Sequence, residues 1–263
     1  MRNRKSTDDY LFSIYLNQGR YSDPKSLVSH SAQVYSQNGE DGYIAEIFNR
    51  IGRRDKYFVE FGVEDGLQNN TRFLLEQGWS GVWVDGAPAA LARARETFDA
   101  YVKSGRLKII ESFVSRDNVD DILDSAQIPG RFDFLSLDLD QNTSHVWNAL
   151  RRHARVACIE YNASIPAGLA LEVPYDENGR WDGTNWFGAG LKRLEQIGGA
   201  KSLSLVGCDL NGVNAFFVDS GEAVGKFAEP FISERHWEPP RYSHINHAGH
   251  QPSKQARRWL PSE

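Results

Sequence analysis

The residues best suited to chemistry stand in a short acidic stretch, Glu60-Phe-Gly62-Val-Glu-Asp-Gly66, which ends an apolar run. Glycines there let the backbone approach a ligand closely. A dinucleotide fingerprint needs a third glycine and a pyrophosphate at a helix terminus. Each carboxylate of the stretch would repel a pyrophosphate by ~1 kcal/mol even at high dielectric. The stretch therefore predicts a cationic nucleoside, S-adenosylmethionine, with Glu60 reaching its ammonium directly or through water.

Two further positions fit such a nucleoside. Asp85 ends the next apolar run, where Rossmann-type folds place the acidic residue that binds ribose hydroxyls, roughly 20 residues beyond the glycine loop. Ser112 and Phe113 follow a third run, where the adenine would lie, and Phe113 either stacks on the base or belongs to the core. The alternative is that the two glycines are turn residues and Asp85 caps the helix that Pro88 opens.

Hard oxygen ligands follow two later apolar runs. Asp138 and Asp140 stand after the first, and Glu160 and Asn162 after the second. Methyl transfer to a hydroxyl needs a positioned acceptor and removal of its proton. We expect Asp138 and Asp140 to act in that step, with His145 as an alternative general base. Asp138, Glu160 and Asn162 could hold Mg²⁺; the alternative is that Asp140 and Asn162 only cap loops and helices.

These positions require a parallel sheet, since the carboxyl ends of its strands meet at one edge. Strands alternating with helices predict an α/β, Rossmann-like, doubly wound sheet. Asn211-Gly212 predicts a closing antiparallel hairpin, giving a seven-stranded, mostly parallel sheet. The expected strands are Tyr57–Phe61, Gly81–Asp85, Leu107–Ile110, Phe132–Asp138, Val156–Glu160, Ser202–Cys208 and Asn214–Val218. The expected helices are Asn38–Ile51, Thr71–Gln77, Pro88–Lys103, Val119–Ala126, Ser144–His153 and Gly190–Ile197, the first capped by Asn38 and the last stopped by Gly198-Gly199.

The sequence resembles the FkbM-type methyltransferases, a branch of the class I S-adenosylmethionine-dependent O-methyltransferases, from about Tyr35 to Val218. The segments that carry the resemblance are Ser36-Gln-Asn-Gly-Glu-Asp41, Phe58-Val-Glu-Phe-Gly62 with Asn70-Thr71 and Gly78-Trp79-Ser-Gly81, Leu135-Ser-Leu-Asp138-Leu-Asp140, and Ile159-Glu160-Tyr-Asn162. The resemblance implies that Gln37, Asn70 and Thr71 border the cofactor pocket and that Asp138 and Asp140 lie by the substrate. Asp140-Gln141 replaces the family's frequent Glu-Gly, and the segment after Asn162 is longer than in a minimal member. The substrate lid is therefore expected to be particular to this protein.

Composition limits the remaining possibilities. The 263 residues carry 30 basic and 35 acidic side chains, which argues against nucleic acid as a partner. We expect an extension over 1–35, a Rossmann-like domain over 36–220 and a tail over 221–263 that covers the active site. Cys158 and Cys208 are expected to be buried free thiols, which with the absence of a membrane-spanning run favours the cytoplasm. A homo-oligomer remains open.

Aromatic and histidine side chains late in the sequence allow two interpretations each. Trp181, Trp186 and Phe187, set among glycines, either form a loop over the acceptor site or pack in the core. His244, His247 and His250 fit a polar loop better than a zinc site, because their spacing matches no zinc pattern. The leading hypothesis is an O-methyltransferase acting on a small molecule or saccharide. The alternatives are a nicotinamide-dependent oxidoreductase and a cofactor-binding module without catalysis.

Overall fold

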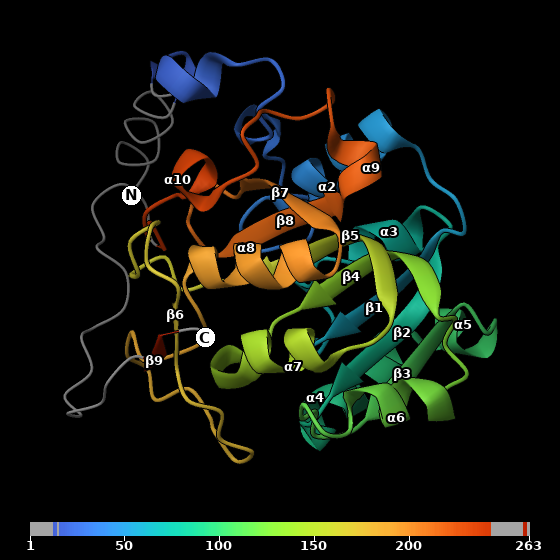
Figure 1. Ribbon diagram of the computed structural model, residues 1–263. Coiled ribbons are helices and arrows are strands. Elements are labelled where there is room, and N and C mark those ends of the chain that lie inside the picture. Colours follow the sequence, from blue (N-terminus) through green and yellow to red (C-terminus); the bar gives the residue numbers. More distant parts are fainter. Residues whose placement is uncertain (1–12, 15, 243–259, 262–263) are drawn as a thin grey trace, which may run out of the picture.

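The computed structural model describes residues 13–14, 16–242 and 260–261, and it is built around one twisted sheet (Figure 1). The sheet has seven strands in the order β3-β2-β1-β4-β5-β8-β7. The strands are β1 (Tyr57–Phe61), β2 (Ser80–Asp85), β3 (Leu107–Glu111), β4 (Arg131–Leu137), β5 (His153–Glu160), β7 (Leu203–Cys208) and β8 (Asn214–Asp219). The first five pair in parallel, and β8 runs antiparallel to both β5 and β7. This order, with its closing antiparallel hairpin, confirms the predicted Rossmann-like fold of class I methyltransferases.

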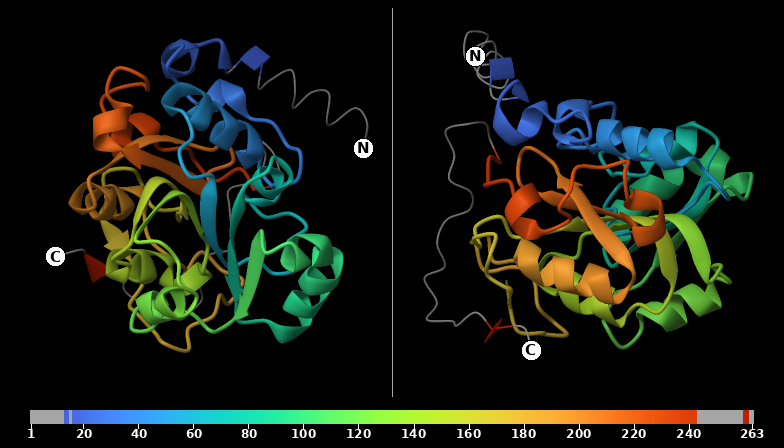
Figure 2. Two further views of the ribbon diagram at one scale, coloured as in Figure 1. Left: turned by 90° about the vertical axis from the view of Figure 1, so that its right-hand side faces the viewer. Right: turned by 45° about the horizontal axis from the view of Figure 1, so that its top comes forward.

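Helices cover both faces of the sheet, as the two further views show (Figure 2). The helices are α2 (Glu40–Ile51), α3 (Arg72–Glu76), α4 (Pro88–Thr97), α5 (Asp99–Lys103), α6 (Val119–Ser125), α7 (Thr143–Ala149), α8 (Leu191–Ala200), α9 (Ser220–Ala223) and α10 (Ser233–His236), with short 3-10 turns η1 (Gly19–Ser22), η2 (Val28–His30) and η3 (Asp140–Asn142). Alternate side chains of each strand enter opposite cores, because the side-chain period of a strand is two. In β1, Phe58 packs with α2, α3 and α4, whereas Val59 belongs to the core beneath α6, α7 and α8.

Every predicted strand is present, but several predicted helix ends are wrong. The helix predicted over Pro88–Lys103 is interrupted at Phe98 and forms α4 and α5. Helix α7 ends at Ala149 because His153 already begins β5. Helix α8 continues through Gly198-Gly199 to Ala200. A Cβ on Gly198 would lie 2.8 Å from the Phe217 ring that packs there, so close packing rather than a helix end explains this glycine. Asn38 does not cap α2; Gly39, with a φ of +83°, occupies that position.

Beyond β8 the chain is described without a gap to residue 242, and this part packs on the sheet domain. Phe227 and Ala228 are buried, and α10 lies against β7. A small second sheet pairs β6 (Leu171–Glu172) with β9 (Leu260–Pro261). His244, His247 and His250 lie outside the described residues. No helix among those described is long and apolar enough to cross a membrane.

Candidate active site

The end of β1 turns sharply because Gly62 lies against the end of β4. Its φ is +78°, and a Cβ there would lie 1.8 Å from the Asp138 carbonyl oxygen. The Gly62 N–H donates to the Val84 carbonyl, and Asp138 N–H donates to Phe61. Gly66 lies against the Trp83 ring in the same way. These backbone contacts bring the glycine loop and the end of β4 to one place at the carboxyl edge of the sheet.

Glu60 points inward from β1 and organises the loop that follows. Its side chain is only 3% exposed. One carboxylate oxygen accepts the Asn70 N–H at 2.9 Å, and the other accepts the Asn69 amide, the Thr71 N–H and the Thr71 hydroxyl. Burial raises the Glu60 pKa to about 7. The carboxylate therefore fixes residues 69–71, and these contacts occupy oxygens that the sequence assigned to the cofactor ammonium.

Asn70 and Thr71 are held in turn by buried neighbours. The Asn70 amide donates to the Ser136 hydroxyl at 3.0 Å, and the Trp83 indole donates to the Thr71 hydroxyl at 2.7 Å. Both residues thus join the segment that leads into α3 to the centre of the sheet. Only one of them, Asn70, is partly accessible, whereas Thr71 is fully buried.

Protonation of Glu60 predicts a pH dependence of stability. Its pKa is raised in the folded protein, so between about pH 4.5 and 7 the native state keeps a proton that the unfolded state has lost. Stability should fall across this window by about 3 kcal/mol in total. In Glu60→Gln this decrease in the free energy of unfolding should disappear. It should persist in the control Glu96→Gln, which changes an exposed residue of α4. Urea unfolding at several pH values measures this, and equal slopes in wild type and Glu60→Gln would contradict it.

Asp85 and Phe113 lie side by side at the ends of β2 and β3. Asp85 accepts the Glu64 N–H at 2.9 Å and the Ala87 N–H at 2.7 Å, one on each oxygen. Each oxygen keeps a lone pair for a further donor. Phe113 is 47% exposed and packs beside Gly86, so it is not a core residue. Its neighbour Ser112 donates its N–H to the Asp85 carbonyl. This pairing of acceptor oxygens with an exposed aromatic ring suits a nucleoside.

The loop before α2 is folded around Asp41. One Asp41 oxygen accepts the N–H groups of Val34, Tyr35 and Ser36 and the Ser36 hydroxyl. Gln37 follows and is exposed, and its carbonyl accepts from Gln33 at 3.3 Å. These hydrogen bonds to Asp41 give the Ser36–Asp41 segment a structural role.

Three carboxylates meet where β4 and β5 end. One oxygen each of Asp138, Asp140 and Glu160 lies within 4.8 Å of the others. Burial raises the pKa of Asp138 and, with repulsion from its neighbours, that of Glu160 well above its usual value. Burial and the Asp138 charge raise the Asp140 pKa to about 6. Because like charges this close cannot all be ionised cheaply, the cluster is built to hold a proton or a cation.

Asn162 and His145 are committed to other contacts. The Asn162 amide donates to the carbonyls of Asn185 and Phe187, and its oxygen accepts the Ser164 N–H. His145 Nε2 lies 2.8 Å from the Val173 carbonyl. A carbonyl only accepts, so Nε2 is the donor in this contact. Both side chains thus hold the segment after β5.

Sequence reasoning missed a second acidic pair beside the cluster. Asp209 accepts the N–H groups of Asn211, Val213 and Asn214, while Glu40 accepts the Asn214 amide at 2.8 Å. Burial, followed by the nearby Glu40 charge, raises the Asp209 pKa to about 8. The Asp-x-Asn-Gly pattern of the hairpin was the available signal, since an Asp at a turn accepts nearby backbone N–H groups.

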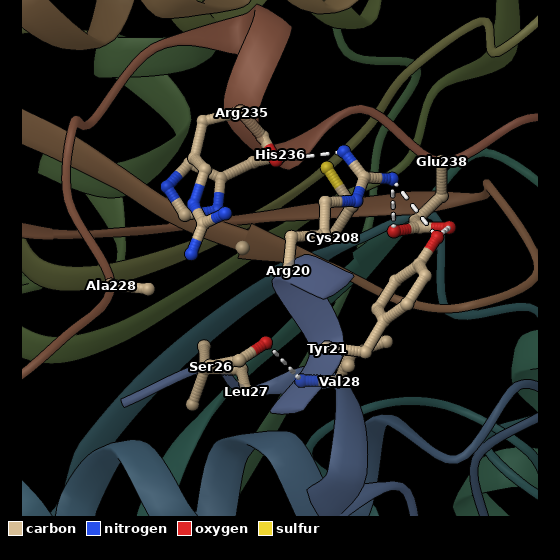
Figure 3. A pocket seen from close by; sticks show the side chains of 11 residues that line it. Arg20, Tyr21, Ser26, Leu27, Val28, Cys208, Ala228, Arg235, His236 and Glu238 are labelled. Carbon is tan, nitrogen blue, oxygen red and sulfur yellow. Dashed lines mark hydrogen bonds and ion pairs between the residues drawn. The ribbon is translucent and has the colours of Figure 1, made fainter. Parts of the chain in front are cut away.

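A separate open hollow lies beside β7, where residues 20–28 meet residues 228–238 (Figure 3). Arg20 crosses it, donating to the carbonyls of Arg235 and Trp237 and pairing with Glu238 at 2.7 Å. None of the residues predicted from the sequence for the site lines it. Its polar groups join the N-terminal and C-terminal segments, and we assign it a structural role.

Comparisons with known proteins return methyltransferases. A S-adenosylmethionine-dependent methyltransferase from Clostridium acetobutylicum is 11% identical over 80% of this chain and 98% of its own, with a TM-score of 0.45. A candidate O-methyltransferase from Klebsiella pneumoniae is 16% identical over 81% and 96%, with a TM-score of 0.47. The N-terminal domain of EvdMO1, solved with S-adenosylhomocysteine (SAH) bound, is 13% identical over 70% and 81%, with a TM-score of 0.45. No family model and no curated protein matches the sequence.

The strand order of the sheet, rather than these likenesses, defines the class of fold, which is that of class I methyltransferases. Within that class the comparisons single out no narrower family, so the FkbM-type resemblance rests on the sequence segments alone.

Proposed function

We propose that the protein is a S-adenosylmethionine-dependent methyltransferase that methylates a hydroxyl of a small molecule, in the manner of the FkbM-type enzymes. The observation that carries this is the meeting of the Gly62 turn with the Asp138, Asp140 and Glu160 carboxylates at one edge of the sheet. The SAH bound by EvdMO1 supports the choice of cofactor. Asp85, Ser112 and Phe113 are proposed to bind the nucleoside, and Gln37, Asn70 and Asp138 to border it.

The acceptor proton is the chemical task left to the protein. S-Adenosylmethionine, when bound, supplies an electrophilic methyl group on a sulfonium that is already a good leaving group. Asp138 would accept the hydroxyl proton as the new carbon–oxygen bond forms, and Glu160 would hold Asp138 in place through a shared proton. Asp140 beside them would orient the acceptor hydroxyl. General-base assistance of this kind contributes typically 10²–10⁴-fold to a rate.

Thermal unfolding tests the cofactor directly. SAH at about 100 times its dissociation constant should stabilise the protein by about 2.7 kcal/mol, whereas NAD and NADP should not. Asp85→Ala should weaken SAH binding by about tenfold, because the ribose loses its acceptor oxygens. The exposed Asp121→Ala on α6 serves as the control. Stabilisation by NAD but not by SAH would favour the oxidoreductase instead.

A divalent cation at the same carboxylates is the second proposal. Three carboxylate oxygens are the donors Mg²⁺ prefers, and the second Glu160 oxygen is buried with no hydrogen-bond partner among the described residues. Asp138, Asp140 and Glu160 would hold the ion; we leave Asn162 out because its amide is occupied. The ion would acidify the acceptor hydroxyl.

Calorimetric titration with MgCl₂ checks this proposal. We expect wild type to bind Mg²⁺ and Asp140→Asn to bind it at least about tenfold more weakly, because one anionic ligand is lost. Asp121→Asn is again the control. Absence of binding in wild type would leave the shared proton as the occupant of the cluster.

A further inference from the structure

The segment between β5 and α8 is a loop whose two ends are joined by hydrogen bonds. Asn162 N–H donates to the Ala189 carbonyl at 2.8 Å, and its amide donates to the carbonyls of Asn185 and Phe187. Further along, Gly190 N–H donates to Leu171 and Val173 N–H donates to Gly188. The two arms of the loop are therefore paired by main-chain hydrogen bonds, and the loop leaves and re-enters the domain at one point.

The same loop is fastened along η3 and α7. The Asn142 amide donates to the Asp176 carbonyl at 2.8 Å, and Asp176 N–H donates back to Asn142 at 3.4 Å. The Ser144 hydroxyl donates to Glu172 at 2.9 Å. A Cβ on Gly188 would lie 3.3 Å from the Asp140 carbonyl oxygen. The loop thus runs directly beside Asp140, and β6 within it lies against α8 (Figure 1).

Trp181 is the aromatic side chain that this loop presents to solvent. It is 40% exposed, while Trp186 and Phe187 are buried. Its indole N–H donates to the Thr184 carbonyl at 2.7 Å, and its ring packs edge-on against Phe187 with the centroids 6.4 Å apart. Since Phe187 precedes Gly188, the Trp181 ring is one side chain removed from the Asp140 backbone. The ring is held in place and keeps accessible surface.

The charge around this ring restricts what it can bind. The Asp138, Asp140 and Glu160 carboxylates cluster together, and Gly188 of the loop lies against the Asp140 backbone. The Glu64 charge also acts on Asp140. Carboxylates beside an aromatic surface accept hydroxyl hydrogens and repel anions, while the ring packs against an apolar face. Arg180, which precedes Trp181 in the sequence, is an exposed cation.

We infer that Trp181 is a specificity-determining residue for the methyl acceptor, and that the acceptor is an uncharged, hydroxylated ring that stacks on it. This inference rests on the proposed function. It assigns the 171–188 segment as the wall of the acceptor site. A neutral pyranoside and a phenol are both uncharged, hydroxylated rings, and the experiment below distinguishes between them.

Saturation-transfer NMR in the presence of SAH tests the inference. The probes are methyl α-D-glucopyranoside, catechol and, as the anionic counterpart, glucose 6-phosphate. We expect one neutral probe to bind wild type, and Trp181→Ala to weaken it by about fivefold or more. Trp181→Phe should retain most of the binding, whereas Trp181→Leu, which keeps apolar bulk without a ring, should lose it. Leu169→Ala, at an equally exposed apolar position of the same loop (48%), should change nothing.

Each outcome is decisive. Binding of catechol alone identifies a phenol as the acceptor class, and binding of the glucopyranoside alone identifies a saccharide. Neutral probes that bind equally to wild type and Trp181→Leu, or that do not bind at all, would overturn the inference while SAH binding leaves the proposed function intact. Preference for glucose 6-phosphate would also overturn it. Failure of wild type to bind SAH would remove the proposed function and the inference together.

Discussion

Replacing Asp138 by Asn is expected to lower the rate of methyl transfer by about three orders of magnitude. The amide has the size of the carboxylate but cannot accept the proton that the acceptor hydroxyl must lose. SAH affinity should change by less than about tenfold, because the nucleoside contacts are proposed to lie at Asp85 and Phe113. Release of SAH with a proven acceptor measures the rate, and calorimetry measures the affinity. Asp121→Asn on α6 controls for loss of an exposed charge.

Glu160→Gln separates the two proposals for the cluster. Burial and the neighbouring Asp138 charge hold the Glu160 pKa well above its usual value, and we propose Glu160 as the protonated member of the pair. Glutamine imitates a neutral carboxylic acid, and the rate should then fall by less than about tenfold. A fall as large as that in Asp138→Asn would favour metal ligation by Glu160. If Asp138→Asn retained more than a tenth of the wild-type rate, the assignment of the base would be wrong.

The sheet could be predicted from the sequence because most of its strands are buried on both faces. Such strands read as continuous apolar runs, and runs such as Tyr57–Phe61 were located to the residue. The Asn211-Gly212 pair predicted the position of the hairpin, because Asn and Gly tolerate the positive φ that a tight hairpin turn requires. Helix ends were harder, because tertiary packing decides them. The sequence predicted that α8 stops at Gly198, but the helix continues through it, and the glycine is there because the Phe217 ring occupies the space a side chain would need.

The sequence predicted which strand ends carry the candidate site residues, but not the direction of each side chain. Strand ends placed Glu60, Asp85, Asp138 and Glu160 at one edge, as expected for parallel strands. A sequence does not reveal whether a strand-end carboxylate faces a ligand or a neighbouring backbone. Glu60 turns to the N–H groups of residues 70 and 71, and Asn162 turns to the joined ends of its own loop. Both contacts depend on segments whose path the sequence pattern does not specify.

The largest effect on stability is expected from Gly62→Ala, with Gly105→Ala as its matched control. Both glycines have a positive φ, +78° and +74°, which costs an alanine roughly 1 kcal/mol. Around Gly105 nothing lies within 4 Å of a Cβ, whereas at Gly62 the Cβ would meet the Asp138 carbonyl oxygen at 1.8 Å. Relieving that overlap must separate the ends of β1 and β4, which adds about 1–3 kcal/mol. The difference between the two variants therefore measures the close approach alone.

In thermal unfolding, Gly105→Ala should lose about 2–4 °C and Gly62→Ala about twice that or more. The separation of β1 from β4 also moves Asp138 away from the glycine loop. Gly62→Ala should therefore weaken SAH binding by at least about tenfold, while Gly105→Ala binds SAH as wild type does. Equal loss of stability and unchanged SAH affinity in both variants would show that the contact between Gly62 and Asp138 contributes to neither. The close packing of these two backbone segments would then be irrelevant to the cofactor, and the pairing of the glycine loop with the carboxylates would lose its physical basis.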